Sequence, residues 1–321
     1  MKQFILALAV LGAFTTPQAG MAQDAYPSRL IRLVVPFAPG GNTDVVGRVT
    51  AAYMQKALNA NVVVENRVGA GGLLGTDVVA KATPDGYTLC LCGIGPITVS
   101  PATEKLPYDP LKDLVPISLV NTNPLVLIAN PKINAKTAAE LVALAKSTPG
   151  GLSYGTGGIG GLMHFSAEIF RKKTNSPLTT VPYRGGALAT TAVVSGEVPF
   201  AFANMSDAMG QIAAGTVRPL AITTAKRSPQ TPEIPTLVEL GLVDYPVESW
   251  NGLFAPAGTP KPIIDRLAGV MAEMAKDAAH QKRMADIGSI AVANSPGDFA
   301  TMLVEETQQW AKALKEIGIA K

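Results

Sequence analysis

Residues 31–44 read IRLVVPFAPGGNTD, and this stretch decides the fold. Its first half, Ile31 to Phe37, is a short run rich in β-branched residues and predicts a buried strand. Two adjacent glycines, Gly40 and Gly41, then predict a sharp turn. The stretch that follows, from about Val45 to Leu58, predicts a helix. A strand, a glycine-rich turn and a helix in this order are typical of an α/β protein with parallel strands.

The same unit recurs along the chain. Further strands are predicted at 62–65, 87–92, 152–154, 178–183, 198–203 and 220–224, with helices between them and a mostly helical tail after residue 260. In the helix predicted at 137–146, Thr137 and Glu140 form a capping box. A long apolar segment, 114–130, is broken by Pro124 and could run from one lobe into the next. The predicted fold class is therefore α/β, with mostly parallel sheets flanked by helices.

Size and composition narrow the class of protein. Roughly 300 residues beyond the N-terminal segment exceed what one compact core usually holds, so we expect two lobes. The net charge of +3 is too small to suggest binding to nucleic acid. A disulfide between Cys90 and Cys92 would strain a regular strand, so we expect two buried free thiols. With only 2 His in the chain, neither a metal site nor a cofactor is expected.

The N-terminus has the pattern of an export signal. Lys2 supplies a positive charge, and residues 4–14 form an apolar run too short to span a membrane. Gly20 and Ala22 fit the small positions of a signal-peptidase site, which predicts that residues 1–22 are removed and that Gln23 becomes the N-terminus. The alternative is a buried N-terminal helix. No later stretch reaches the length of a membrane span.

The turn at 39–44 is the first candidate binding site. Its glycines allow the backbone to approach a ligand, and Asn42, Thr43 or Asp44 can cap the following helix. The unpaired N–H groups at the start of that helix would make a seat for one carboxylate. The alternative is a tight turn that binds nothing. The predicted contacts here are Phe37, Gly40, Gly41, Asn42, Thr43 and Asp44.

The second candidate is the glycine-rich stretch 155–161, GTGGIGG, between a strand and a helix. It contains the GxGxxG spacing of dinucleotide sites, but the next strand ends at residues 181–184, VPYR, without the acidic residue that would hold a ribose. A second anion-binding helix N-terminus is the better interpretation, and plain backbone packing is the alternative. The predicted contacts are Gly157, Gly158, Ile159 and Gly160.

Several single residues could complete such a site. His164 could face the anion or cap a neighbouring loop, and Arg184 could pair with a carboxylate or remain a solvated surface residue. Asn204 and Ser206 follow a predicted strand and could supply neutral donors. Trp250 could be a core aromatic or part of the pocket wall, and the core is favoured.

A catalytic constellation is not recognisable. The chain has no GxSxG nucleophile elbow, and neither His164 nor His280 has an obvious nucleophile and orienting acid nearby in the sequence. We therefore expect a binding protein and not an enzyme.

Longer motifs resemble those of the tripartite tricarboxylate transporter receptors, the Bug proteins. They cover most of the mature chain in one order and comprise 26–28 (YPS), 31–41 (IRLVVPFAPGG), 63–67 (VVENR), 69–72 (GAGG), 84–89 (PDGYTL), 106–110 (LPYDP), 181–185 (VPYRG) and 252–260 (GLFAPAGTP). The resemblance implies a two-lobed periplasmic binding protein of the type II, flytrap kind. It also implies that the ligand lies between the lobes, with carboxylates held by backbone amides and bridging waters from Gly40, Gly41, Asp44 and the loop 157–161.

These inferences give the expected organisation: a signal peptide at 1–22, one lobe formed by 23–123 plus 226–321, and a second lobe formed by 124–225. The resemblance implies a monomeric periplasmic receptor that captures a small carboxylate and delivers it to membrane permease subunits. The segment 156–164, TGGIGGLMH, is more apolar than is usual in the family, because of Ile159, Leu162 and Met163, and favours an aromatic or otherwise hydrophobic acid. The alternatives are an accessory of a carboxylate-sensing signalling system, or an exported hydrolase or isomerase that uses His164.

Overall fold

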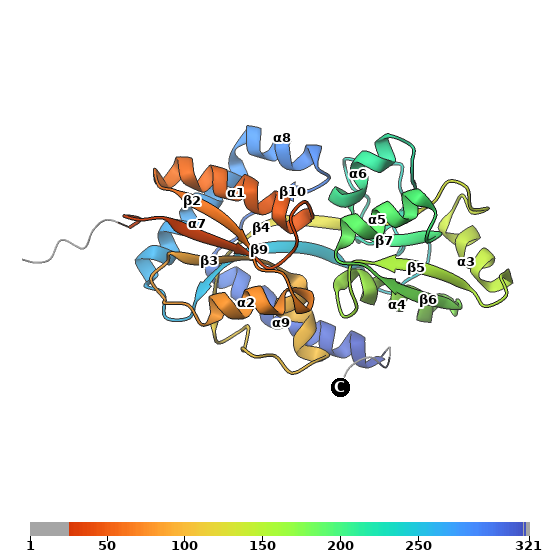
Figure 1. Cartoon of the computed structure of the whole chain (residues 1–321), viewed down its shortest axis with the longest axis horizontal. Helices are drawn as coiled ribbons and strands as arrows, with labels where there is room; N and C mark the ends of the chain where they lie inside the picture. Colours follow the sequence, from red (N-terminus) through yellow and green to blue (C-terminus); the bar gives the residue numbers. More distant parts are fainter. Residues whose placement is uncertain (1–25, 317, 319–321) are drawn as a thin grey trace, which may run out of the picture.

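The computed structural model describes residues 26–316 and residue 318. The predicted signal segment and the new N-terminus at Gln23 lie outside the described residues. The described chain forms two lobes side by side, and a sheet of ten strands runs through both of them (Figure 1).

The first lobe holds the strands in the order β2-β1-β3-β9-β4, with β10 also paired to β4. The strands are β1 Ile31–Val35, β2 Val62–Asn66, β3 Thr88–Gly93, β4 Leu114–Ala129, β9 Glu248–Pro256 and β10 Ile290–Ala291. The helices of this lobe are α1 Asn42–Leu58, η1 Ala70–Gly72, α2 Leu73–Ala80, η2 Gly95–Val99, η3 Ser100–Ala102, α7 Lys261–Lys276, α8 Ala278–Asp286 and α9 Pro296–Glu316.

The second lobe continues the sheet in the order β4-β7-β5-β6, with β8 also paired to β4. Its own strands are β5 Leu152–Thr156, β6 Leu178–Pro182, β7 Phe200–Asn204 and β8 Arg218–Ile222. Its helices are α3 Ala138–Ser147, α4 Leu162–Thr174, α5 Gly186–Ser195 and α6 Met205–Ala213. As predicted, Thr137 is the N-cap of α3 and its side chain accepts a hydrogen bond from the Glu140 N–H.

Strand direction follows from how the chain enters each lobe. In the first lobe β1 is parallel to β2 and β3, and in the second lobe β5 is parallel to β6 and β7. The longer strands that run the other way are those that arrive from the opposite lobe. Strand β9 is antiparallel to β3, and the end of β4 is antiparallel to β7 and β8. The α/β class in two lobes is confirmed, with a sheet that mixes parallel pairs inside each lobe with antiparallel pairs along β4 and β9.

Strand β4 confirms that the apolar segment 114–130 crosses between the lobes. It pairs with β9 as far as Pro124 and with β7 from Leu125 onward. The returning strand, β9, was not predicted. It contains Asn251 and Gly252 and has no alternating pattern, because eight of its nine residues are buried. Continuous burial on both faces removes the period of two that marks a half-buried strand.

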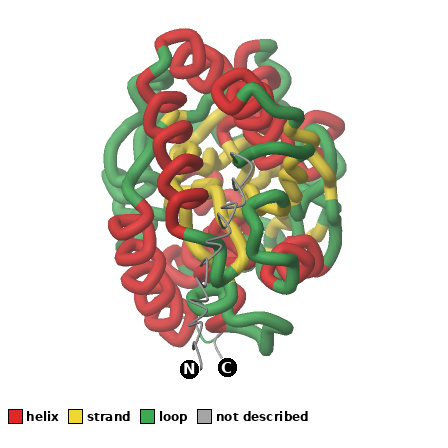
Figure 2. The backbone as a smooth tube through the Cα atoms, turned by 90° about the vertical axis from the view of Figure 1, so that its left-hand side faces the viewer, coloured by secondary structure: helices red, strands yellow, loops and turns green. Residues whose placement is uncertain are grey.

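Helices cover both faces of the sheet (Figures 1 and 2). On one face of the first lobe, α1 and α7 bury Met54 and Met271 completely against the strands. On the other face, Trp250 packs edge-on against Phe299 and is 3% exposed, which confirms it as a core residue. Each fully buried side chain of this size contributes about 1.5–3 kcal/mol, so both layers stabilise the sheet on which the site is built.

Two sequence-based expectations are wrong. Helix α1 begins at Asn42, and its N-cap is Gly41 without a side-chain hydrogen bond, so none of Asn42, Thr43 and Asp44 caps it. Cys90 and Cys92 are joined by a disulfide and are not free thiols. Their Cα atoms are 5.5 Å apart, whereas two residues of extended strand span roughly 6.6 Å, so β3 is shortened locally to a separation that a disulfide can bridge.

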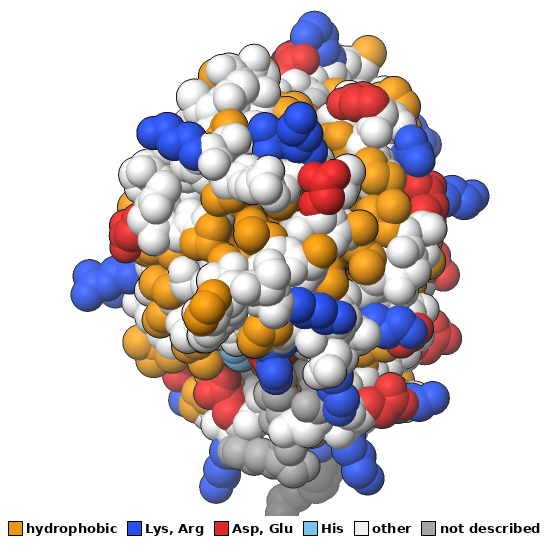
Figure 3. Space-filling model, turned by 90° about the vertical axis from the view of Figure 1, so that its right-hand side faces the viewer, with side chains coloured by type: hydrophobic (Ala, Val, Ile, Leu, Met, Phe, Trp, Pro, Cys, Tyr) orange, Lys and Arg blue, Asp and Glu red, His pale blue; other side chains and the backbone are white. Residues whose placement is uncertain are grey.

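The end face of the second lobe carries charges of both signs. Basic and acidic side chains are interspersed there around a band of hydrophobic ones, without a single-sign patch (Figure 3).

Candidate ligand-binding site

Two helices, one in each lobe, begin with the same backbone geometry. The N-cap of α1, Gly41, is extended at φ −83° and ψ 171°, and the N-cap of α4, Gly161, at φ −88° and ψ 168°. The preceding residues, Gly40 and Gly160, are left-handed with φ +85° and φ +79°. Neither helix has a side-chain cap. Each lobe therefore presents the first N–H groups of a helix without a capping side chain.

Gly40, Gly158 and Gly160 are required in these turns by their positive φ and not by crowding. A residue with a Cβ is strained by about 1–2 kcal/mol at such a positive φ. Yet a Cβ added at Gly40, Gly158 or Gly160 would meet no atom within 4 Å. The space beside both turns is open, and a small molecule can approach the backbone there.

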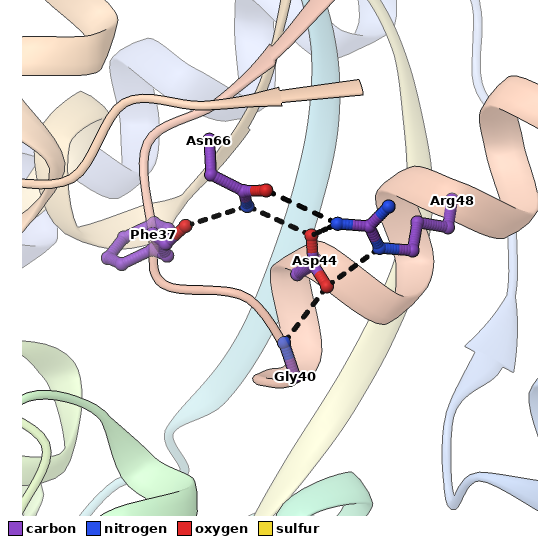
Figure 4. A network of polar contacts seen from close by, with 5 residues as sticks. All are labelled: Phe37, Gly40, Asp44, Arg48 and Asn66. Carbon is purple, nitrogen blue, oxygen red and sulfur yellow. Dashed lines mark hydrogen bonds and ion pairs between the residues drawn. The ribbon is translucent and has the colours of Figure 1, made fainter. Parts of the chain in front are cut away.

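Asp44 organises the first turn from within the first lobe (Figure 4). Its carboxylate accepts hydrogen bonds from the Gly40 N–H, from two nitrogens of Arg48 and from the Asn66 amide, all at 2.9 Å. The same Asn66 amide donates to the Phe37 carbonyl at 2.9 Å. Burial alone would raise the pKa of Asp44, but the donors from Arg48, Gly40 and Asn66 outweigh it and hold the pKa below its usual value. Asp44 is therefore an ionised brace of the turn.

His164 has the corresponding position in the second turn. The Gly160 N–H donates to His164 Nδ1 at 3.4 Å, just as the Gly40 N–H donates to Asp44 four residues later. Burial lowers the pKa of His164, which keeps the imidazole neutral and able to accept at Nδ1. The ring therefore caps the turn that precedes its own helix, and its contact with a ligand anion stays a prediction.

The loops of the second lobe converge beside this turn. A Cβ on Gly157 would lie 2.9 Å from the Gly186 nitrogen and 3.1 Å from Met163 Sδ, so the turn before α4 packs directly against the start of α5. Arg184, in the same loop as Gly186, is exposed and forms no ion pair within the described residues. Ile159 is 60% exposed at the tip of the turn. Leu162, expected in the wall of the site, is instead buried in the core.

Asn42 ties the first turn to the second lobe. Its side-chain oxygen accepts from Ser206 Oγ at 3.1 Å and from Asn123 Nδ2 at 2.9 Å. Asn123 is fully buried on β4, next to the change of partner strand, and also reaches Ser206 at 2.8 Å and Ser289 at 3.1 Å. These contacts form a polar cluster of Asn42, Asn123, Ser206 and Ser289 that joins the two lobes at the start of α1.

Two predicted contacts of the first turn are used inside the first lobe. The Thr43 hydroxyl donates to Asn251 Oδ1 at 2.9 Å, and Asn251 in turn donates to Asn121 at 2.9 Å. The Phe37 ring packs over Gly72, where a Cβ would lie 2.9 Å from its Cζ. The side chains of Thr43 and Phe37 therefore fix the turn against β9 and η1.

Asp207, which was not predicted, stands between the two lobes. It lies in the first turn of α6 and accepts a hydrogen bond from Asn204 Nδ2 at 3.1 Å. A Cβ on Gly186 would lie 2.3 Å from its Oδ2, so the carboxylate contacts the start of α5 directly. Although the side chain is partly exposed, burial by the surrounding atoms raises its pKa to about 6, opposed by hydrogen bonds from Asn204 and from the Asn42 backbone.

The structure thus brings the predicted residues into one region, through contacts from Gly157 to Gly186 and Asp207 and from the adjacent Ser206 to Asn42 and Asn123, while their contact with a ligand stays a prediction. Arg184 and Ile159 lie on exposed parts of the same loops, while Asn204 directs its amide to Asp207. The buried amides Asn121 and Asn123 were missed, although a polar residue inside the apolar segment 114–130 was a signal that could have found them.

Two surface hollows of the described chain do not coincide with the candidate site. These hollows, of about 410 and 540 Å³, are lined by residues around Asn59 and around Glu140 and by none of the predicted contacts. Among residues 26–316 and 318, no group of three His, Cys, Asp or Glu side chains could hold a metal ion. None of the helices in the described part is both long enough and apolar enough to cross a membrane.

Two lobes joined by crossing strands, each with an uncapped glycine turn near the boundary, define a two-lobed periplasmic binding protein. Comparison with known proteins agrees. Protein BugT of Bordetella pertussis is 36% identical over 316 residues, which cover 97% of each chain. The solved structure of R. palustris Rpa4515 with adipate has a TM-score of 0.88 at 32% identity, covering 92% of this chain and 99% of that one.

The structure of MatC (Rpa3494) from Rhodopseudomonas palustris with bound malate has a TM-score of 0.84 at 32% identity, covering 90% of this chain and 100% of that one. The model of the tripartite tricarboxylate transporter family receptor matches residues 46–319. The chain belongs to this family, which is one of solute-binding receptors and not of enzymes.

Proposed function

We propose that this protein is a periplasmic receptor that captures a small carboxylate between its lobes and delivers it to the membrane permease of a tripartite tricarboxylate transporter, without catalysing a reaction. The observation that carries the proposal is the pair of matching turns at Gly40–Gly41 and Gly160–Gly161. Each offers helix N–H groups, which favour an anion, and each has open space beside it.

The relatives support the choice of a carboxylate. Rpa4515 was solved with adipate and MatC with malate, and both are acids with a carboxylate at each end. One helix N-terminus in each lobe matches such a ligand. A ligand that contacts both turns favours the closed arrangement of the lobes, because only that arrangement brings both turns to it.

The apolar residues near the second turn favour a ligand with a hydrophobic body. Ile159 is 60% exposed at the turn, and Leu188 is 51% exposed on α5. We therefore expect an aromatic or long aliphatic acid to bind more tightly than citrate or aspartate. Tight binding of citrate or aspartate with none of adipate, benzoate or phthalate would contradict this preference.

The test is a thermal-shift screen followed by calorimetry on the mature chain, from Gln23 onward. A ligand present at 100 times its Kd stabilises the folded state by about 2.7 kcal/mol, which should raise Tm by several degrees. The panel comprises adipate, malate, citrate, aspartate, benzoate and phthalate. The absence of a shift with every acid would sink the proposal.

A matched pair of glycine variants tests the turn itself. Gly160 and Gly150 have φ of +79° and +80°, and a Cβ at either would meet nothing within 4 Å. Gly150 lies at the far end of β5 from the site. Gly160→Val and Gly150→Val should therefore lose similar stability from backbone strain, but only Gly160→Val should lose at least tenfold in ligand affinity. Equal affinities in the two variants would show that the turn does not hold the ligand.

Delivery is tested in the source organism. Deletion of the gene should abolish uptake of the bound acid, and export of the mature chain should be seen as cleavage after Ala22. Loss of gene induction with uptake retained would instead identify the accessory of a sensing system.

A further inference from the structure

Asp207 occupies a position where the proposed ligand also needs room. Its carboxylate contacts Gly186 at the start of α5, and the preceding residue, Ser206, donates to Asn42 Oδ1 at the first residue of α1. The proposed seat for a ligand carboxylate is the same helix N-terminus. A protein carboxylate from the second lobe therefore stands close to the N–H groups that the ligand would use in the first lobe.

Two carboxylates at one site cannot both remain ionised without a large cost, because like charges at about 4 Å repel strongly where water is scarce. We propose that Asp207 takes up one proton from solvent when a carboxylate ligand binds beside it, so that the receptor captures its ligand together with a proton. The Asp207 carboxyl group then donates its O–H to the ligand carboxylate. The inference rests on the proposed function. It implies that the protonation of Asp207 responds to the charge of the bound ligand.

The surroundings of Asp207 leave this carboxylate without a charged partner. The charged and titratable groups on the neighbouring elements are Arg184 before α5, His164 on α4, and Asp44 with Arg48 on α1. Asp44 and Arg48 neutralise each other, and Arg184 is exposed. Asp207 forms no ion pair within the described residues, and its printed hydrogen bond comes from the Asn204 amide. A ligand anion would therefore be its nearest uncompensated charge.

The sign of the pH dependence distinguishes this proposal from displacement of Asp207 by the ligand. Without ligand, burial raises the pKa of Asp207 to about 6. If the ligand joins Asp207, its pKa rises further, and affinity increases as pH falls through the interval above 6. If the ligand displaces Asp207 into solvent, its pKa drops, and affinity decreases as pH falls. Each unit of pKa change alters the affinity about tenfold between the two ends of the interval.

The experiment is calorimetry with adipate, malate and benzoate between pH 6 and pH 8.5, where these acids stay ionised. We expect the Kd at pH 6 to be on the order of tenfold lower than at pH 8. Titrations in two buffers of different ionisation enthalpy should show net uptake of up to one proton near pH 7. An affinity that is flat, or that falls at lower pH, would overturn the proposal.

Three variants identify the side chain that takes up the proton. Asp207→Asn keeps an acceptor for Asn204 and for the Asn42 N–H but carries no charge, so it should bind at pH 8 about as tightly as the unaltered protein at pH 6, without proton uptake. His280→Gln and Glu306→Gln remove two other titratable groups, both away from the proposed ligand, and should retain the pH dependence. Retention of the dependence in Asp207→Asn would overturn the inference while leaving the receptor function intact. If no acid binds at any pH, the proposed function fails and the inference falls with it.

Discussion

Asp44 and His164 hold corresponding positions in the two turns, but with different chemistry. Asp44 is ionised and satisfied by Arg48, Gly40 and Asn66, whereas His164 is neutral and accepts one weak bond from Gly160. The first turn is therefore held by charge and the second by a single ring nitrogen. At the scale of the residue, the two turns differ in the interaction that holds their conformation.

Replacement of Asp44 by Ala should destabilise the fold by about 1–3 kcal/mol, because it removes the acceptor from the part-buried Gly40 N–H and from Arg48. The pKa of Asp44 is lowered in the folded state, so its contribution is present above the unfolded pKa near 4 and is lost as pH falls through the lower, folded value. Urea unfolding should therefore give a lower free energy of unfolding for Asp44→Ala than for the unaltered protein at pH 7. This difference should shrink at pH 3.

The control for this prediction is Asp265→Ala. Asp265 also pairs with a basic residue four positions away, Lys261, but both side chains are more than half exposed. Exposed pairs of this kind contribute little, so the control should unfold close to the unaltered protein. Equal losses in the two variants would mean that Asp44 does not brace its turn.

The sequence predicted the residues of the turns but not the role of Asp207. The stretch 205–207, MSD, reads as an ordinary helix start with an acidic residue in its first turn. Its neighbours lie on other elements, Gly186 at the start of α5 and Asn42 at the start of α1. Only the fold reveals that these three meet, since no local pattern encodes a contact between lobes.

Helix α9 and the segment η2 are joined by one buried carboxyl group. Glu306 accepts from Thr98 Oγ1 at 2.8 Å and from the Trp250 ring nitrogen at 3.0 Å. Burial raises the pKa of Glu306 to about 7, against the hydrogen bonds from Thr98 and Trp250. At the scale of elements, these hydrogen bonds hold α9 against β9 and η2.

Because the folded pKa of Glu306 lies above its unfolded value near 4.5, the folded state holds an extra proton between these two values. Stability should therefore fall as pH rises from about 5 to about 7 and then level off. Glu306→Gln should remove that decline. In a Trp310→Phe background, which leaves Trp250 as the single Trp, the fluorescence of Trp250 should titrate near pH 7, and Glu306→Gln should abolish this change. A signal that is constant from pH 5 to pH 8.5 would refute the assignment.

Elements with a local signal were predicted within a few residues, as the Thr137 cap and the strand expected at 62–65 illustrate. Strand β9 was missed because burial on both faces erases its pattern. The free thiols were wrongly expected because the prediction assumed a regular strand, and β3 is shortened at Cys90 and Cys92. In each of these failures, packing around the segment overrode what the segment alone favours.

At the scale of the whole molecule, the lobes are linked by β4 and β9 and by α9. The Trp310 ring on α9 lies 6.5 Å from the ring of Phe165 on α4, centroid to centroid, so this first-lobe helix also packs on the second lobe. The polar cluster around Asn123 adds hydrogen bonds at the boundary. Relative motion of the lobes must therefore bend the strands near Pro124 and break these bonds.

Two neighbouring asparagines separate the bonds between lobes from those within one lobe. Asn123 reaches Asn42, Ser206 and Ser289, whereas Asn121, two positions earlier and equally buried, contacts only Ser289 and Asn251. Replacement of either by Ala should cost about 1–3 kcal/mol of stability. Only Asn123→Ala should also weaken ligand binding and increase the radius of gyration of the free protein in small-angle X-ray scattering. The same increase in the radius of gyration in Asn121→Ala would contradict the role of Asn123 in holding the lobes together.

The matching geometry of the two turns has a consequence for ligands with two acidic ends. Turns with the same φ and ψ at their glycines cannot tell one carboxylate from another, so by themselves they would accept such a molecule in either direction. Asp207 breaks the equivalence, because it stands beside α1 and α5 and not beside both turns alike. We therefore expect the distance between the turns to determine which ligand length fits. We expect Asp207 to determine the orientation of the ligand, so that an unsymmetrical acid binds in one direction only.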